Sequence, residues 1–146
     1  MTFTLQRART DTTCRGHSYG QVAGFFDTTD CVGLSRALYS ANVGGHPVVV
    51  AISHVRMSDA ATAQGLKQLA DSNGTGNVSD LLREGVRYPG GPTALHASEY
   101  SSAQHGAEVT IVETSWVFAA SPGSSAQLDS AANSGQELDV PAVPGG

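Results

Sequence analysis

The chain has 146 residues, 40% of them apolar, and a formal net charge of −5 at pH 7. This length and composition predict one globular domain. The 8 basic residues form no cluster beyond the spaced Arg7 and Arg9, which argues against a nucleic-acid-binding surface. No apolar run approaches the roughly 18 residues that a membrane-spanning helix requires.

Three segments differ in composition. Residues 1–13 lack the apolar core of a secretory leader, so either the protein is cytoplasmic or a leader or anchor has been trimmed, leaving a linker or an extra strand. Residues 14–119 hold the periodic elements of the predicted domain. Residues 120–146 are dominated by Ser, Ala, Gly and Pro, a composition that buries too little surface to offset ordering entropy and predicts a flexible tail.

The two cysteines, Cys14 and Cys31, are the only ones in the chain. We favour one structural disulfide, which would stabilise the fold by roughly 3 kcal/mol through the entropy of the unfolded loop and would persist outside the reducing cytosol. Two buried free thiols are one alternative. A metal site completed by His17 and His46 matches no standard zinc spacing, and the C-x-x-C motif of a redox pair is absent.

Short apolar patterns predict the first two secondary-structure elements after Cys14. The run GQVAGFF at 20–26 predicts a strand that follows a turn. Residues 27–45 predict a helix, because Cys31, Leu34 and Leu38 recur at helical spacing.

Stronger patterns follow along the chain. Residues 46–57 are rich in β-branched side chains and predict a central strand. Residues 58–77 predict a helix, and residues 77–85 predict one or two short helical turns. Residues 98–118 predict a hairpin with its turn at His105 and Gly106.

The order strand, helix, strand, helix, short helix, strand, strand predicts an α+β fold. We expect a mainly antiparallel sheet with helices on one face, and the ferredoxin-like (split βαβ) sandwich is the nearest named topology. In the predicted strand at 46–57, the side chains that point to either face of the sheet are apolar. The second face of the sheet therefore also needs a cover. A second protomer in a homodimer, residues 2–6 or the loop after Gly85 would each provide one.

The run DCVGLSRALYSANVGGHPVVVAISHVRMSDAATAQGLKQLADSNGTGNVSDLLREG at 30–85 is followed by YPGGP at 88–92. Together they resemble uncharacterised secreted or membrane-anchored proteins of high-GC actinobacteria. The resemblance covers about residues 14–117. It implies an extracytoplasmic domain behind one N-terminal signal or anchor, with membrane attachment only through that anchor. It implies no activity, cofactor or site residue.

Two histidines are candidate functional residues. His54 lies in the most apolar predicted strand, and His17 lies close to Cys14. Either could act as a base in a hydrolase, together with a Ser or Asp. The other interpretation is that His54 is an ordinary hydrogen-bonded residue of the sheet. Neither of the hydrolase motifs H-E-x-x-H and G-x-S-x-G occurs in the chain.

Four further residues are weaker candidates. Asp27 and Asp30 could bind calcium, but the EF-hand pattern is missing and helix capping explains both. Arg87 and Tyr88 lie in RYPGGP, which could contact a ligand or serve as a rigid connector.

Glu108 and Glu113 are not candidate site residues. They flank a strand of mixed pattern, and we expect both on a solvated face.

We therefore expect a non-catalytic extracytoplasmic binding or assembly domain for an unidentified protein or cell-envelope partner. No metal, cofactor or nucleic acid is expected. One alternative is a small secreted hydrolase that uses His54 or His17. The other is a secreted protease inhibitor, which would present a rigid exposed loop beside the disulfide.

Overall fold

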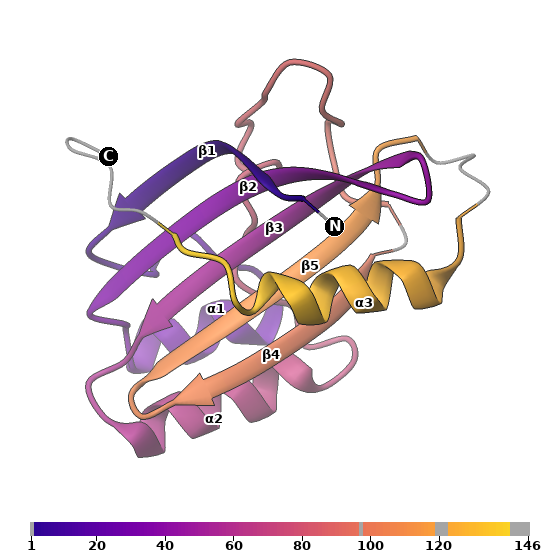
Figure 1. Ribbon diagram of the computed structural model, residues 1–146. Helices are drawn as coiled ribbons and strands as arrows, with labels where there is room; N and C mark the ends of the chain where they lie inside the picture. Colours follow the sequence, from indigo (N-terminus) through magenta and orange to yellow (C-terminus); the bar gives the residue numbers. More distant parts are fainter. Residues whose placement is uncertain (1, 97, 119–122, 141–146) are drawn as a thin grey trace.

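The computed structural model describes residues 2–96, 98–118 and 123–140. Five strands form one sheet in the order β1-β2-β3-β5-β4 (Figure 1). The strands are β1 (Thr4–Asp11), β2 (Gly33–Val43), β3 (His46–Arg56), β4 (Glu99–His105) and β5 (Glu108–Trp116). The helices are α1 (Gly20–Thr28), α2 (Ala60–Asp71) and α3 (Ser125–Gly135). The α+β class with an antiparallel sheet is confirmed.

The strand order contains one split βαβ unit. Every neighbouring pair of strands is antiparallel, so β3 and β4 run in the same direction with β5 between them. Helix α2 joins β3 to β4. The first helix is used differently from a ferredoxin-like fold, because α1 joins β1 and β2, which are antiparallel neighbours. Residues 4–11 thus form an edge strand of the sheet.

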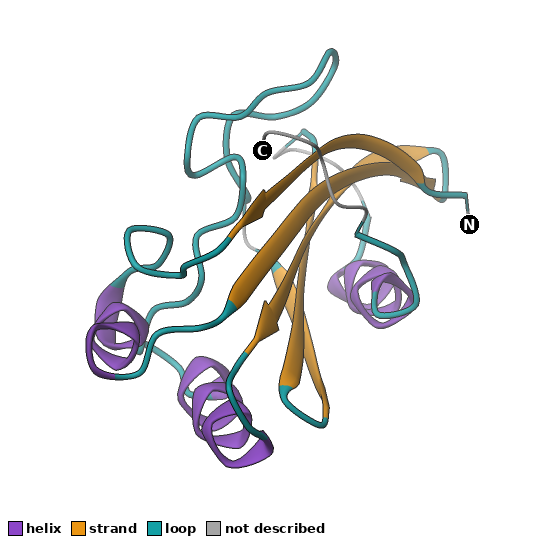
Figure 2. Ribbon diagram, turned by 90° about the vertical axis from the view of Figure 1, so that its left-hand side faces the viewer, coloured by secondary structure: helices purple, strands orange, loops and turns teal. Residues whose placement is uncertain are grey.

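Helices lie on both sides of the sheet. Seen along its edge, α1 and α2 lie on one side and α3 lies on the other (Figure 2). We call these sides the α1/α2 face and the α3 face. The connection between α2 and β4, residues 72–98, packs Leu81, Leu82 and Tyr88 against β3 residues Val49 and Ala51. The cover of the second face is therefore α3, which belongs to the same chain.

Helix α3 corrects the expectation of a flexible tail for the described part of residues 120–146. Its N-terminus is a capping box in which Ser124 Oγ accepts from the backbone N–H of Gln127, and Gln127 Oε1 accepts from the backbone N–H of Ser124. Residues 120–122 and 141–146 of the expected tail lie outside the described residues.

The small residues that suggested disorder allow α3 to approach the sheet closely. Leu128, Ala131 and Ala132 are buried. A Cβ atom at Gly135 would lie 2.7 Å from Val112 Cγ1, so only glycine fits this contact. Close packing of small side chains thus replaces the large apolar surface that the composition lacks.

Two elements between Gly20 and Val43 differ from the sequence prediction. Residues 20–26, expected as a strand, belong to α1, which buries Val22 and Phe26 on one side because residues four apart share a helical face. Residues 33–43, expected as part of a helix, form β2. This strand is buried on both faces, so apolar residues that point to both sides imitate helical spacing. Leu34 packs against α1 and α2, Leu38 lies on the same face and packs against the 72–98 connection, and Ala37 and Tyr39 face α3.

The stronger sequence patterns are confirmed. The strand at 46–57 is β3, the helix at 58–77 contains α2, and the hairpin at 98–118 contains β4 and β5. Asp59 caps α2 by accepting a hydrogen bond from the backbone N–H of Thr62 (2.8 Å). Residues 81–85 form hydrogen-bonded turns rather than a helix.

Candidate functional site

Cys14 and Cys31 form a disulfide with their Cα atoms 5.6 Å apart, and both residues are buried. The predicted pairing is confirmed. A metal site that uses both thiolates is therefore wrong. His46, its proposed fourth ligand, instead lies edge-on to the Trp116 ring with 6.0 Å between the ring centroids. A persistent disulfide is compatible with an extracytoplasmic location.

Asp30 stabilises the disulfide loop rather than a helix. Its carboxylate accepts hydrogen bonds from Thr13 Oγ1 and from the backbone N–H groups of Cys14 (2.9 Å) and Cys31 (2.8 Å). Burial alone would raise the pKa of Asp30, but these hydrogen bonds outweigh it and hold the pKa below its ordinary value. Asp27 is exposed, and its backbone carbonyl accepts from Arg15 Nη2 (2.8 Å). The predicted calcium ligands thus have separate structural roles.

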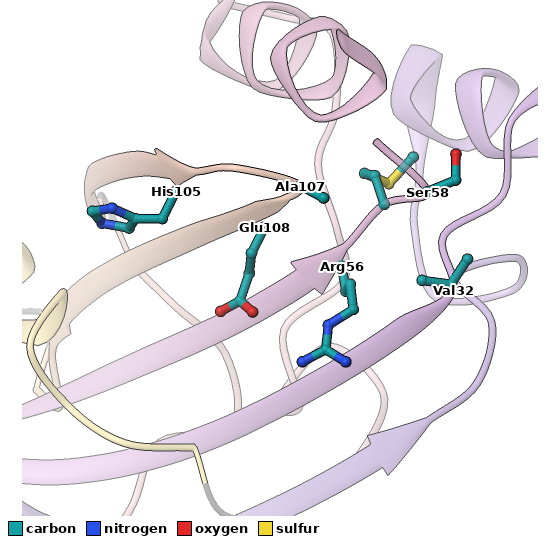
Figure 3. Close-up of a pocket in the computed structure, with 7 residues that line it drawn as sticks. Val32, Arg56, Ser58, His105, Ala107 and Glu108 are labelled. Atoms are coloured by element: carbon teal, nitrogen blue, oxygen red, sulfur yellow. The ribbon is translucent and has the colours of Figure 1, made fainter. Parts of the chain in front are cut away.

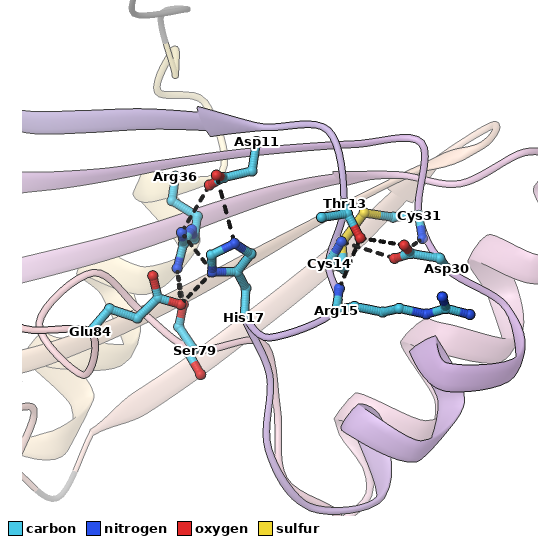
Figure 4. A network of polar contacts seen from close by, with 10 residues as sticks. All are labelled: Asp11, Thr13, Cys14, Arg15, His17, Asp30, Cys31, Arg36, Ser79 and Glu84. Carbon is cyan, nitrogen blue, oxygen red and sulfur yellow. Dashed lines mark hydrogen bonds and ion pairs between the residues drawn. A yellow bond between two sulfur atoms is a disulfide. The ribbon is translucent and has the colours of Figure 1, made fainter. Parts of the chain in front are cut away.

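His17 belongs to an ion-pair network around the buried Arg36 (Figure 4). Arg36 is only 1% exposed, and its Nη1 lies 2.8 Å from Glu84 Oε2 and donates to the Ser79 carbonyl at 2.9 Å. Its Nη2 lies 3.1 Å from Asp11 Oδ2. His17 lies between the two carboxylates, with Nδ1 2.8 Å from Glu84 Oε2 and Nε2 3.6 Å from Asp11 Oδ1.

This network joins β1, β2, the disulfide loop and the 72–98 connection. Burial would raise the pKa of Glu84, but the hydrogen bonds from Arg36 and His17 hold it below its ordinary value. In the described part of the chain, the imidazole ring of His17 contacts two carboxylates and a guanidinium. Because none of these is a hydroxyl, the network is an electrostatic clamp and not the base–nucleophile pair that a hydrolase needs.

His54 points to the α3 face, as its parity with Val48, Val50 and Ile52 predicts. Its side chain is 23% exposed, and Nδ1 lies 3.7 Å from Glu108 Oε1. Burial lowers the pKa of His54, and the Glu108 carboxylate only partly opposes this effect. His54 is thus a sheet residue near the end of β3, where it pairs across the sheet with Ser35 of β2 and lines, with Ser35 and Glu108, a pocket of about 270 Å³. Within the described residues its ring contacts the Glu108 carboxylate and makes no hydrogen bond with Ser35, so the base–nucleophile contact that a hydrolase needs is not formed in this structure.

An open groove of about 620 Å³ lies where β3 and the β4–β5 hairpin end (Figure 3). Its side chains do not converge on one point. His105 lies at one end and points away from Arg56, while Val32 lies at the other end (Figure 3). The groove is lined by Val32, Arg56, Met57, Ser58, His105, Ala107 and Glu108.

Arg87 and Tyr88 stabilise the 72–98 connection. Arg87 Nη1 donates to the carbonyl oxygens of Leu82 (2.8 Å) and Val86 (3.0 Å). Tyr88 is buried in the cluster that contacts β3. These contacts correspond to the rigid-connector interpretation of RYPGGP.

A second, polar pocket of about 230 Å³ lies between β5, the 72–98 connection and the turn before α1. We call it the Glu113 pocket. Carboxylate, guanidinium, phenol and hydroxyl groups meet there beside two apolar side chains. It is lined by Tyr19, Asp80, Arg83, Ala94, Leu95, Ser98 and Glu113.

Backbone pairing between two loops brings Tyr19 to this pocket. The backbone N–H of Tyr19 donates to the Asn77 carbonyl (3.0 Å), and that of Ser79 donates to the His17 carbonyl (2.7 Å). Gly76 has a positive φ of 83°, and a Cβ atom there would collide with the Tyr19 carbonyl oxygen. The glycine in the NGTGN segment therefore permits the close contact between the loops.

Glu113 is the most strongly perturbed carboxyl group of the pocket. Asn77 Nδ2 donates to its Oε1 (3.3 Å) and Ser98 Oγ donates to its Oε2 (3.2 Å). Burial raises the pKa of Glu113 to about 7, and the nearby Asp80 carboxylate adds to the effect. Ser98 and Arg83 oppose the shift without cancelling it.

The two other charged residues of the pocket, Arg83 and Asp80, use only some of the hydrogen-bonding groups of their side chains. The Arg83 guanidinium lies over the Tyr19 ring, 3.7 Å from its centroid, in a cation–π arrangement. Asp80 Oδ1 accepts from the backbone N–H of Arg83 (3.0 Å). None of the six ion pairs that join side chains of the described residues includes Glu113, Asp80 or Arg83.

Sequence reasoning missed this site. Glu113 was expected on a solvated face, but it shares the parity of Val109 and Ile111, which lie in the core beneath α1 and α2. That parity is the signal that places the carboxyl on the inward face of β5. Asp80 and Arg83, in contrast, lie in a connection whose path depends on tertiary contacts.

Comparisons of the chain with protein-family models, with curated proteins and with solved structures found no match. Within residues 2–96, 98–118 and 123–140, no helix has the length and apolar character needed to cross a bilayer.

Proposed function

We propose that the chain is a non-catalytic extracytoplasmic binding domain and that the Glu113 pocket is its ligand site. One observation carries this proposal: a mostly buried carboxyl group faces a cavity and has no ion-pair partner among the described residues. An ionised carboxylate in such a place is costly unless a positive group compensates it. A bound ligand that supplies hydrogen-bond donors or positive charge would provide that compensation.

The composition of the pocket favours binding over hydrolysis. Ser98 donates to Glu113, but no histidine lines the cavity, so the His-dependent hydrolase arrangement is not assembled there. The size of about 230 Å³ is just below the roughly 300–1,000 Å³ of pockets for drug-sized ligands. A small polar molecule fits better than a polymer segment.

One observation and one expectation from the sequence support the extracytoplasmic part of the proposal. The Cys14–Cys31 disulfide would not persist in a reducing compartment. The resemblance to secreted or anchored proteins that we expect from the sequence of about residues 14–117 agrees with this location. A cell-envelope component is the corresponding class of ligand source.

A fragment screen by NMR on the oxidised, isotope-labelled chain tests the proposal. The set contains neutral, anionic, cationic and zwitterionic molecules of fewer than about twelve heavy atoms. We expect shifts at Ser98, Arg83 and Glu113, and their loss when Ala94→Trp fills the cavity. Ala107→Trp, in the groove of Figure 3, is the matched control. Shifts confined to that groove, or no shifts with any class, would contradict the proposal.

A further inference from the structure

The Glu113 pocket offers charges of both signs to one small cavity. Glu113 and Asp80 supply two carboxyl groups, and Arg83 supplies a guanidinium. The three are close enough to affect one another, since Asp80 raises the pKa of Glu113 and Arg83 lowers it. No two of these side chains are joined in an ion pair in the described structure. The pocket therefore keeps a negative and a positive subsite side by side.

Arg83 is suited to hold an anionic group. Its face is occupied by the Tyr19 ring, which fixes the plane of the guanidinium. Stacking uses the face of the group and leaves the N–H donors at its edge, the arrangement by which arginine binds carboxylates in a bidentate manner. The backbone contacts of Tyr19 with Asn77 hold the stacking partner in place.

Glu113 and Asp80 are suited to hold an ammonium group. Glu113 is fixed by Asn77 and Ser98, and Asp80 uses Oδ1 for the backbone N–H of Arg83. Each carboxylate can still accept further hydrogen bonds, since an ionised carboxylate has about four acceptor positions. Ala94 and Leu95 add an apolar wall to the same cavity.

We propose that the Glu113 pocket binds a zwitterion of amino-acid size, with its ammonium group at Glu113 and Asp80 and its carboxylate at Arg83. The side chain of the ligand lies against Ala94 and Leu95. This assignment rests on the proposed function of the pocket and names its ligand class. A ligand with only one of the two charges leaves one subsite unpaired.

The test compares complete zwitterions with their halves. Calorimetry and NMR titration at about pH 8, where an α-carboxylate is ionised and a carboxyl with a pKa of about 7 is also ionised, use L-alanine and L-leucine. The matched probes are ethylamine and 3-methylbutylamine, which lack the carboxylate, and propionate and 4-methylpentanoate, which lack the ammonium group. We expect at least one zwitterion to bind about tenfold or more tightly than either of its halves.

Variants assign the two subsites. Glu113→Gln keeps the hydrogen-bonding shape and removes the negative charge, so it weakens zwitterion binding about tenfold or more, while the carboxylate probe binds at least as tightly as before because a nearby negative charge is gone. Arg83→Gln does the reverse: the amine probe binds at least as tightly as before, and the zwitterion loses affinity. Glu108→Gln, in the groove at the end of β3, is the charge-matched control and keeps wild-type affinity. Thermal unfolding of each variant verifies that the fold is retained.

Three results would overturn this assignment. If the amines bind as tightly as the zwitterions and Arg83→Gln has no effect, the pocket is a cation site and the anionic subsite is wrong. If neutral or anionic fragments shift the pocket signals while no zwitterion does, the proposed binding function survives and the ligand class fails. If no fragment of any class shifts them, both fail together.

Discussion

Tyr39 on β2 donates a hydrogen bond to the backbone carbonyl of Asp139 (2.6 Å), which lies 100 positions later in the chain. The contact extends the cover of the α3 face beyond the end of α3. Leu138 and Val140 pack partly buried against the same apolar cluster. The described C-terminal segment is therefore part of the core of the fold.

This docking predicts a measurable stability contribution from α3. Leu128 is buried against the sheet, so Leu128→Ala should lower the free energy of unfolding by about 2–5 kcal/mol. Phe118, which is 65% exposed, is the control, and Phe118→Ala should change it by less than about 0.5 kcal/mol. Denaturant unfolding followed by circular dichroism measures both. Equal, small effects would mean that α3 does not contribute to the core.

The sequence predicted correctly the elements whose local residue pattern is compatible with only one type of secondary structure. The β-branched run of β3 and the capped, amphipathic α2 are examples, because Asp59 and the spacing of Ala63, Leu66 and Ala70 act locally. The pattern of residues 20–43, in contrast, is compatible with both helix and strand. Val22 and Phe26 fit either a strand or a helix, and β2 is buried on both faces, so only the pairing with β1 and β3 decides the outcome.

The candidate site was less predictable than the fold. The disulfide follows from cysteine arithmetic, and the orientation of His54 follows from strand parity. The Glu113 pocket depends instead on the path of the 72–98 connection and on a backbone contact between Gly76 and Tyr19, which no local pattern encodes. The same reason explains why Arg36, an ordinary charged residue in the sequence, is the buried centre of the network in Figure 4.

Arg36 should be among the least replaceable charged residues of the described chain. Arg36→Met preserves much of the side-chain volume but deprives Asp11 and Glu84 of the guanidinium that they share. Because both carboxylates are partly exposed, we expect a loss of about 2–4 kcal/mol, near the lower part of the range for broken buried pairs. Urea denaturation at neutral pH provides the value.

Lys67→Met is the matched control for Arg36. Lys67 forms an i,i+4 ion pair with Asp71 (2.8 Å), and both side chains are about one-third exposed. Surface pairs of this kind contribute less than about 1 kcal/mol. A loss at Arg36 no larger than the loss at Lys67 would show that the network is not an electrostatic clamp.

The disulfide should be present in the purified protein and should stabilise it. Under denaturing, non-reducing conditions, alkylation should add no mass, and after reduction it should add two adducts, one each at Cys14 and Cys31. The double variant Cys14→Ala/Cys31→Ala should lose roughly 3 kcal/mol, the value for closing a loop of this length. Two adducts without reduction would contradict both the bond and the inferred compartment.

Glu113 should make stability depend on pH in one direction. Its pKa is raised to about 7 in the folded protein, while the unfolded chain has the ordinary value of about 4.3. Between these values the folded state binds more protons than the unfolded state, so stability falls as pH rises through this window. The contribution of Glu113 is fully present below about pH 4 and is lost above about pH 7.

Comparison with Glu113→Gln isolates this contribution. The lowered pKa of His54 acts oppositely, because it makes stability rise with pH as it approaches the ordinary value of about 6.5. His54 is unchanged in the variant, so its effect cancels in the difference between the two unfolding free energies. We expect Glu113→Gln to gain stability relative to the wild type as pH rises from about 4.5 to about 7, and the difference to level off above that range. A difference that stays flat from pH 4 to pH 8 would mean that the Glu113 carboxyl is solvated, as the sequence pattern first indicated, and would remove the physical basis of the pocket.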